Sequence, residues 1–249
     1  MSEEKIDVLI EKIKLAKKIV AFTGAGVSTE SNIPDFRSAD GLYSAKQNYG
    51  YAPETMLSHS FWKQNTVLFY KYYFEQMIYK DAEPNFAHKG LSYLEELGKL
   101  TAIVTQNIDG LHQMAGSKNV FELHGSVHRN YCIKCGAFYE LENMNRDELG
   151  VPICSSCNGI IKPDVTLYEE ALKAEVMDGA IKAIEEADML IIIGTSLVVY
   201  PAAGLINYFR GNDVVLINKT QTPYDHKADL VISRPAGEVF KEVMNKMTY

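Results

Sequence analysis

Four cysteines form two Cys-x-x-Cys pairs, Cys132/Cys135 and Cys154/Cys157, with 18 residues between the pairs. Two such pairs at this separation can supply four thiolates to one tetrahedral metal ion. Because a shell of four thiolates leaves no position for water, the pattern predicts a structural Zn²⁺ and not a catalytic metal. A thioredoxin-like redox pair is the alternative interpretation, and the doubled spacing argues against it.

A glycine turn near the N-terminus is the second feature that could take part in binding or catalysis. The apolar run 18–23 leads directly into Gly24-Ala25-Gly26. Glycines at such a place let the backbone approach a pyrophosphate, whose charge is met by N–H groups. The ordinary dinucleotide fingerprint has a third glycine where this chain has Thr29, and no acidic residue ends a second strand about twenty residues later. Taken alone, the turn indicates a phosphate loop or simply a tight turn.

The elements that would position these residues follow an α/β rhythm. Continuous apolar runs, typical of buried parallel strands, are expected at 18–23, 101–105, 120–123, 189–193 and 214–217, with an edge strand at 229–232. Helical patterns occur near the N-terminus and at 86–97, 172–187, 202–209 and 237–247. This alternation predicts an α/β fold with a Rossmann-like parallel sheet.

Small or hydrogen-bonding residues follow each of the five main strands. They are Gly24 to Gly26, Gln106 to Gly110, His124-Gly125, Gly194 to Ser196, and Asn218-Lys219. Ligands of open α/β sheets bind at the carboxyl ends of the strands. One such strand end would be explained by turn formation, but five together favour a nucleotide bound in an unconventional way.

Composition restricts the partners. The 249 residues carry a net charge of −7, with 47% hydrophobic and 23% charged residues, as in an ordinary globular protein. Without a basic run, direct binding to nucleic acid is disfavoured, whereas a basic peptide remains compatible. The apolar runs are too short for a membrane span, and no secretory leader is recognisable at the N-terminus, so we expect a cytoplasmic monomer without membrane contact.

Several motifs in a fixed order resemble the sirtuin family over almost the whole chain. They are residues 24–28, 32–37, 105–112 and 122–126, then the paired cysteines, residues 194–197 and Ile217-Asn218. The resemblance implies an NAD-dependent protein-lysine deacetylase. Its large Rossmann-like domain would comprise residues 1–33, 87–127 and 163–249. A helical module at 34–86, rich in aromatic residues, and a zinc-binding module at 128–162 would together form the smaller domain.

The resemblance also implies roles for individual residues. In the family's reaction the acyl oxygen of the substrate attacks the anomeric carbon of NAD as nicotinamide leaves, and a base then activates a ribose hydroxyl, giving O-acetyl-ADP-ribose. His124 suits the base because imidazole titrates near neutral pH. Asn107 and Asp109 would orient the ribose and the nicotinamide amide, although either could also cap a helix. The implied NAD contacts are Gly24, Ala25, Gly26, Thr29, Asp35, Phe36, Arg37, Gln106, Asn107, Ile108, Asp109, Gly194, Thr195, Ser196, Asn218 and Lys219.

The segment expected to contact acyl-lysine departs from the family. Sirtuins usually have an apolar residue and then Phe-Gly-Glu where this chain has Thr166-Leu167-Tyr168-Glu169-Glu170. If the glycine has a positive φ, Glu169 would be strained or would force another loop shape. We expect binding of acetylated proteins or peptides with an altered sequence or acyl preference. The implied substrate contacts are Val165, Thr166, Tyr168 and Val198.

Acyl preference can be narrowed further. Family members that prefer acidic acyl groups carry a Tyr-x-x-Arg pair in the helical module, where this chain has Tyr70-Lys71-Tyr72-Tyr73 and no arginine. A succinyl carboxylate would lack its bidentate partner, so deacetylation is expected over desuccinylation. Two other hypotheses remain: mono-ADP-ribosyl transfer, and a non-catalytic NAD-responsive binding module. His124 argues against the second, because a module that only binds needs no base.

Overall fold

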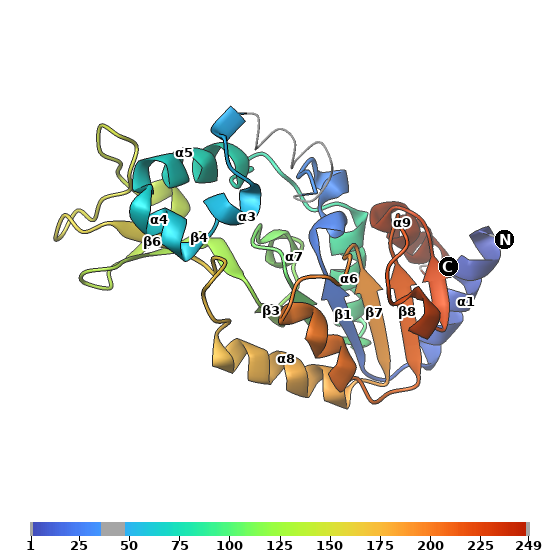
Figure 1. Ribbon diagram of the computed structural model, residues 1–249. Helices are drawn as coiled ribbons and strands as arrows, with labels where there is room; N and C mark the ends of the chain where they lie inside the picture. The colour runs from blue at the N-terminus through green and yellow to red at the C-terminus, as the bar shows by residue number, and fades with distance from the viewer. Residues whose placement is uncertain (1, 36–47, 248–249) are drawn as a thin grey trace.

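A six-stranded parallel sheet forms the larger part of the molecule (Figure 1). The computed structural model describes residues 2–35 and 48–247. The strands lie in the order β3-β2-β1-β7-β8-β9. They are β1 (Ile19–Thr23), β2 (Leu100–Thr105), β3 (Val120–Glu122), β7 (Met189–Ile193), β8 (Asp213–Ile217) and β9 (Leu230–Ile232). All six predicted strands are therefore present, each within one residue of its expected bounds.

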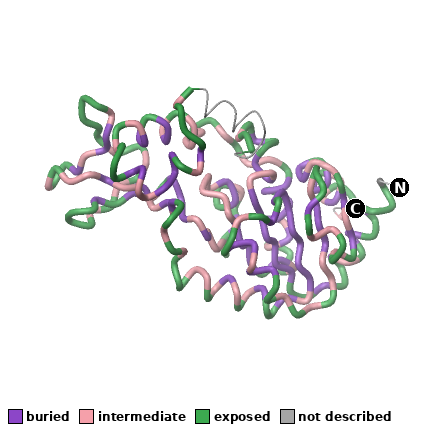
Figure 2. Tube along the Cα trace, viewed as in Figure 1, coloured by how far each residue is buried: buried purple, intermediate pink, exposed green. Residues whose placement is uncertain are grey.

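Helices cover both faces of this sheet, which explains why its strands are continuously apolar. On one face, α1 (Ser2–Leu15), α6 (Phe86–Glu96) and α9 (Ala236–Met247) pack against alternate strand residues such as Ile19 and Ala21. On the other, α8 (Ala174–Glu186) and the 3₁₀ helix η4 (Ala202–Tyr208) pack against Val20 and Phe22. The central strands β1 and β7 are accordingly buried along their whole length, whereas the edge strand β3 is half-buried (Figure 2).

One predicted helix has a different geometry. The segment expected as a helix at 202–209 is the 3₁₀ helix η4, in which the Gly204 N–H bonds to the Pro201 carbonyl, three residues earlier, at 2.9 Å. Gly204 lies within this segment, and glycine has a low preference for the α-helix, which is consistent with the tighter 3₁₀ turn. The sequence pattern marked a helical segment correctly but did not distinguish its type.

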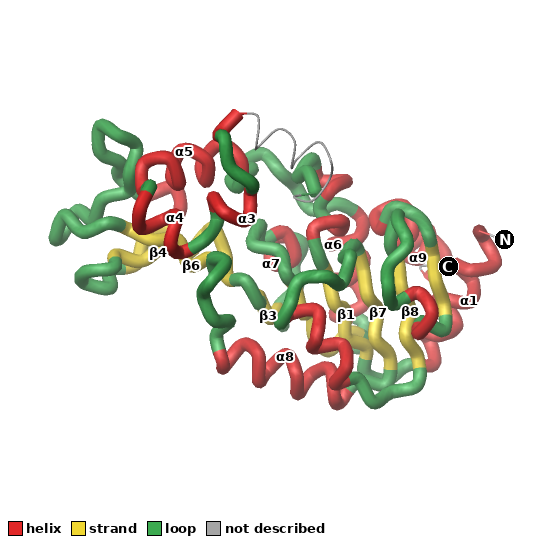
Figure 3. Tube along the Cα trace, viewed as in Figure 1, coloured by secondary structure: helices red, strands yellow, loops and turns green. Residues whose placement is uncertain are grey.

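The second part of the molecule is a three-stranded antiparallel sheet covered by short helices (Figure 3). The sheet contains β4 (Gly125–Cys132), β5 (Phe138–Glu140) and β6 (Ile161–Val165). The helices are α3 (Pro53–Met56), α4 (His59–Gln64) and α5 (Thr66–Gln76). Aromatic side chains of α5, among them Phe69, Tyr70 and Tyr73, are buried against this sheet, as expected for a module core.

The small sheet connects to the larger part of the molecule through its strands β4 and β6. β4 begins at Gly125 and β6 ends at Val165, so both cross the junctions expected near residues 127 and 163. We retain the two-domain division as a proposal, with these strands as the connection between the two cores. Within the described residues, no helix is both long and apolar enough to cross a membrane.

Candidate active site

The glycine turn lies at the carboxyl end of β1, tightly packed on the end of β7. The Gly26 N–H donates to the Gly194 carbonyl at 2.8 Å. A Cβ on Gly24 would lie 2.7 Å from Thr195 Cβ, and one on Gly26 would lie 2.7 Å from Gly194 Cα. The glycines are therefore required by the turn itself. Ala25 and Gly26 are only half-buried and Thr29 is exposed, so the outer side of the turn remains accessible to a phosphate group.

The loop after β2 joins the same site. The Gln106 backbone N–H donates to the Thr23 carbonyl at 3.0 Å, and the Gln106 side chain donates to Thr195 Oγ1 at 3.1 Å. Asp109 Oδ1 accepts from the Leu111 N–H at 2.9 Å, at the first residue of the short helix α7 (Leu111–Met114). The N-cap position of α7 is occupied by Gly110, so Asp109 is not the N-cap residue that the alternative interpretation expected.

Ser28 connects the two loops and was not singled out from the sequence. Its hydroxyl donates to Asp109 Oδ2 at 2.7 Å and accepts from Asn107 Nδ2 at 3.1 Å. Ser28 is buried, whereas Asn107 and Asp109 are half-buried. The hydroxyl thus fixes the directions of both side chains. Its place at the end of the motif 24–28 was the signal in the sequence, but serine is common in turns and the motif assigned it no role.

Two buried histidines support this network from behind. His88 Nε2 lies 3.5 Å from Ser28 Oγ, and His112 Nε2 lies 3.0 Å from Thr23 Oγ1. Their rings are in edge contact at a centroid distance of 4.9 Å. Burial lowers the pKa of His88 to about 4, against an opposing attraction from Asp109. Burial also lowers the pKa of His112 well below its ordinary value. Both are neutral near pH 7 and serve the structure of the site.

Acidification should therefore destabilise the fold. Below a pH of about 6.5 the unfolded chain binds protons at these histidines, whereas the folded protein resists them. The free energy of unfolding is expected to fall as the pH is lowered from 6.5 to about 4, and for His88 alone by about 3 kcal/mol. Urea unfolding across this range measures the slope. His88 Nδ1 accepts from the Asn85 N–H at the N-cap of α6 at 3.2 Å, a bond that a glutamine side chain can also accept. In the His88→Gln variant the slope should therefore be smaller; an unchanged slope would contradict this origin.

His124 follows β3 and lies beside the β2 loop. Its Nδ1 is 2.9 Å from the Gln106 carbonyl oxygen. A carbonyl oxygen only accepts, so Nδ1 carries the proton in the neutral ring and Nε2 carries the basic lone pair. His124 is half-buried, which leaves it within reach of a bound ligand. The geometry thus fixes the tautomer that a general base requires.

The segment after β6 runs directly past His124. The Thr166 N–H donates to the His124 carbonyl at 2.9 Å, and Val165 pairs with Gly125. Tyr168 is exposed, as is Val198 in the loop after β7. Glu169 has a φ of 76°, so the left-handed backbone considered for this position is present with a non-glycine residue. Likewise Asn32 has a φ of 62°, which asparagine tolerates.

Further predicted NAD contacts follow β7 and β8 at the same edge of the sheet. Gly194, Thr195 and Ser196 follow β7, with Thr195 buried and Ser196 exposed. Asn218 and Lys219 follow β8, where the Asn218 amide donates to the Thr220 carbonyl at 2.8 Å. Ile108 is half-buried and Asp35 is exposed. Phe36 and Arg37 lie outside the described residues.

The four cysteines converge at the far end of the small sheet. The Sγ atoms of Cys132, Cys135, Cys154 and Cys157 all lie within 4.8 Å of one another. Tetrahedral zinc with Zn–S bonds of about 2.3 Å places sulfurs about 3.8 Å apart. The observed Sγ separations of 3.4 Å (Cys132–Cys157) and 3.6 Å (Cys135–Cys154) are close to this value. The donor set therefore fits a closed structural zinc site.

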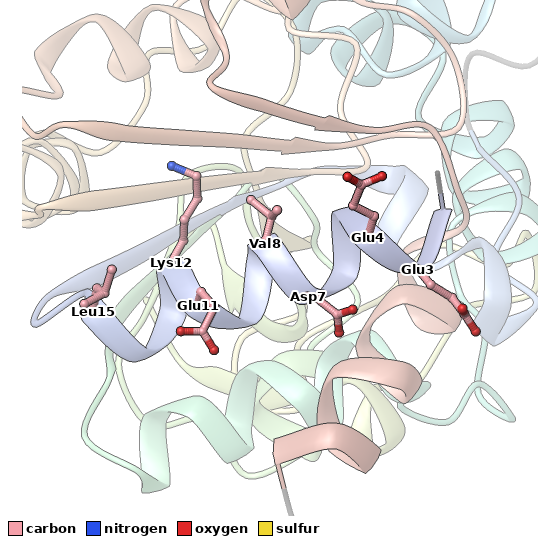
Figure 4. A pocket seen from close by; sticks show the side chains of 7 residues that line it. All are labelled: Glu3, Glu4, Asp7, Val8, Glu11, Lys12 and Leu15. Carbon is pink, nitrogen blue, oxygen red and sulfur yellow. The ribbon is translucent and has the colours of Figure 1, made fainter.

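A surface groove elsewhere does not belong to this site. It lies along α1 and is lined by Glu3, Glu4, Asp7, Val8, Glu11, Lys12 and Leu15 (Figure 4). It contains no residue from the strand ends. Its predominantly acidic lining would also repel a pyrophosphate.

Comparison with known proteins identifies a family and several close relatives in sequence. A family model described as the Sir2 family matches residues 24–201. A protein named NAD-dependent protein deacetylase from Clostridium acetobutylicum is 60% identical, with 95% of this chain and 99% of that protein covered. The protein of the same name from Clostridium perfringens is 59% identical, with coverages of 98% and 100%.

Solved structures agree with these relatives. A Sir2–p53 peptide–NAD⁺ complex has a TM-score of 0.86 and 35% identity, covering 98% of both chains. A complex of a Sir2 homolog with NAD has a TM-score of 0.86 and 37% identity, covering 97% of this chain and 93% of that one. The fold, the strand-end site and the sequence matches thus agree, and the chain belongs to the Sir2, or sirtuin, family.

Proposed function

We propose that this chain catalyses NAD-dependent removal of acetyl groups from protein lysine side chains, with consumption of one water, giving nicotinamide, O-acetyl-ADP-ribose and free lysine. The observation that carries this proposal is the bond from His124 Nδ1–H to the Gln106 carbonyl, which leaves Nε2 as the basic nitrogen of a histidine beside the loop that holds Asn107 and Asp109. A protein that only binds NAD would not need a base in a fixed tautomer.

The polar groups around the site suit NAD binding. NAD, when bound, supplies the ADP-ribosyl group that accepts the acetyl group, with nicotinamide as the leaving group. The glycine turn and the residues after β7 and β8 would hold its phosphates and adenosine. Asn107 and Asp109, whose directions are fixed by Ser28, would orient the ribose and the nicotinamide amide.

His124 would act as the general base. Its Nε2 would take a proton from a ribose hydroxyl, and the developing imidazolium would keep its Nδ1–H bond to the Gln106 carbonyl. Val165, Thr166, Tyr168 and Val198 would contact the acetyl-lysine peptide from two sides of this histidine. The bond between the Thr166 N–H and the His124 carbonyl supports this placement.

The buried state of Tyr70 favours neutral acyl groups. Its hydroxyl donates to the Ile161 carbonyl at 2.6 Å and accepts from Trp62 Nε1 at 3.2 Å, and the side chain is only 1% exposed. Burial raises the pKa of Tyr70 above its ordinary value, so the hydroxyl stays protonated. Tyr70 is therefore committed to the module core and is not positioned to pair with a succinyl carboxylate, while Lys71 is exposed. Deacetylation is expected over desuccinylation.

Mono-ADP-ribosyl transfer would share the first bond cleavage but not the base. We therefore treat it as secondary to deacetylation. We also propose that the chain acts as a cytoplasmic monomer on acetylated proteins, because a reducing compartment keeps four cysteines available as metal ligands. We infer no direct contact with nucleic acid from a net charge of −7.

Mass spectrometry tests the proposed reaction. Purified protein is incubated with NAD and peptides carrying acetyl-, propionyl- or succinyl-lysine. We expect nicotinamide and O-acyl-ADP-ribose to appear in step with loss of the acyl group, fastest for acetyl and slowest for succinyl. A shift of ADP-ribose mass on the protein or peptide, without deacylation, would favour ADP-ribosyl transfer. NAD binding without any product would contradict both.

A further inference from the structure

Glu169 occupies a backbone conformation that its side chain disfavours. Its φ of 76° lies in the left-handed region, where a non-glycine residue outside the Asn/Asp class is uncommon. Such strain persists only where the surroundings hold the residue in place. The contacts of Glu169 show what holds it there.

The Glu169 carboxylate bonds to the beginning of α4. One oxygen accepts from the Ser60 backbone N–H at 2.8 Å and the other accepts from Ser60 Oγ at 2.9 Å. A glycine at this position would relieve the backbone strain but would make neither bond. The side chain thus connects the segment after β6 to an element of the aromatic module.

The backbone next to Glu169 is fixed to the same place. The Tyr168 N–H donates to the Leu57 carbonyl and its carbonyl accepts from the His59 N–H, both at 3.0 Å. Glu170 accepts from His59 Nδ1 at 2.7 Å and from Lys162 Nζ at 3.1 Å. At the other end, Thr166 bonds to the His124 carbonyl. Residues 166–170 therefore run as a short strap between His124 and α4.

We propose that Glu169 is a positioning residue that, through Ser60, fixes the strap 166–170 against α4 and thereby sets the affinity of the site for the acyl-lysine peptide. The proposal rests on the proposed deacetylase function. It assigns to Glu169 no contact with NAD or with the reacting atoms. Its loss should loosen Tyr168, which would contact the peptide, while the bond between the Thr166 N–H and the His124 carbonyl at the other end of the strap and the NAD side stay intact.

Steady-state kinetics with a double-mutant cycle test this role. For E169G we expect the peptide KM to rise about 5- to 10-fold, because two bonds to a carboxylate are lost, while kcat and the KM for NAD stay within about twofold. For S60A the peptide KM should rise less, because the Ser60 N–H remains. The double variant should not exceed E169G, because both changes remove one interaction. E169Q retains an acceptor and should recover most of the affinity.

Two results would overturn the proposal. One is a peptide KM of E169G equal to that of the original protein. The other is a double variant whose increase in peptide KM equals the product of the increases in E169G and S60A. Hydrogen exchange separates this outcome from a failure of the deacetylase function. If the original protein forms no product, the proposed function fails, whereas amides 168–170 should still exchange faster in E169G than in E169Q. Equal exchange in the two variants would reject the strap role regardless of activity.

Discussion

Replacing His124 by alanine is expected to reduce deacetylation by about 10²- to 10⁴-fold, the range attributed to a general acid–base group. The expectation rests on the His124 tautomer, since Nδ1 donates to the Gln106 carbonyl and only Nε2 can accept a proton. The KM for NAD should change little, because Asn107 and Asp109 are held by Ser28 and not by the imidazole. Nicotinamide release in single turnovers, NAD titration and peptide deacetylation measure these effects separately.

His226→Ala is a matched control for this experiment. His226 is exposed in the 3₁₀ helix η5 (Asp225–Lys227), which precedes β9. The substitution therefore also replaces a histidine by alanine, but outside the proposed site. Its kinetics should equal those of the original protein. If the His124 variant kept more than a tenth of the deacetylation rate, another group would have to act as the base. If it lost NAD binding as well, His124 would be a structural residue.

The parallel sheet could be predicted because its information is local. Each strand is a short Val/Ile/Leu-rich run such as 189–193, and the polar residues that follow it are adjacent in sequence. Parallel strands then bring their carboxyl ends to one edge by topology, so Gly24, Gln106 and Gly194 were expected to lie together. The cysteine cluster could be predicted for the same reason, because spacing alone determines which thiolates can meet.

The supporting contacts could not be predicted, because they join residues distant in sequence. Ser28 meets His88 and Asp109 across 60 and 81 positions. Serine and histidine have many ordinary uses, so neither residue signals such a network alone. Glu169 was recognised as a possible source of strain, but its partner Ser60 is 109 positions away. The type of helix at 202–208 was also missed, since 3₁₀ and α periodicities differ little over seven residues.

The zinc site and His124 are connected through two strands. β4 begins at Gly125, directly after His124, and ends on the ligand Cys132. β6 begins at Ile161, which is buried beside Cys154, and leads to Thr166, whose N–H bonds to the His124 carbonyl. Both backbone connections to His124, the proposed base, therefore depend on the order of the small sheet. A metal that holds the far end of this sheet should also control catalysis.

Removal of zinc is accordingly expected to abolish deacetylation and to unfold the small sheet. Apparent binding free energies of structural zinc in small peptides are about 10 to 16 kcal/mol, comparable to the stability of a whole domain. Cys154→Ser should have the same effect, because Cys154 is fully buried within the cluster. Metal content, near-UV circular dichroism and activity should fall together, and for the chelated protein they should return with added Zn²⁺. Ser155→Ala, a neighbouring substitution outside the ligand set, should keep zinc and activity. Full activity in metal-free protein would show that the connection through β4 and β6 does not position His124.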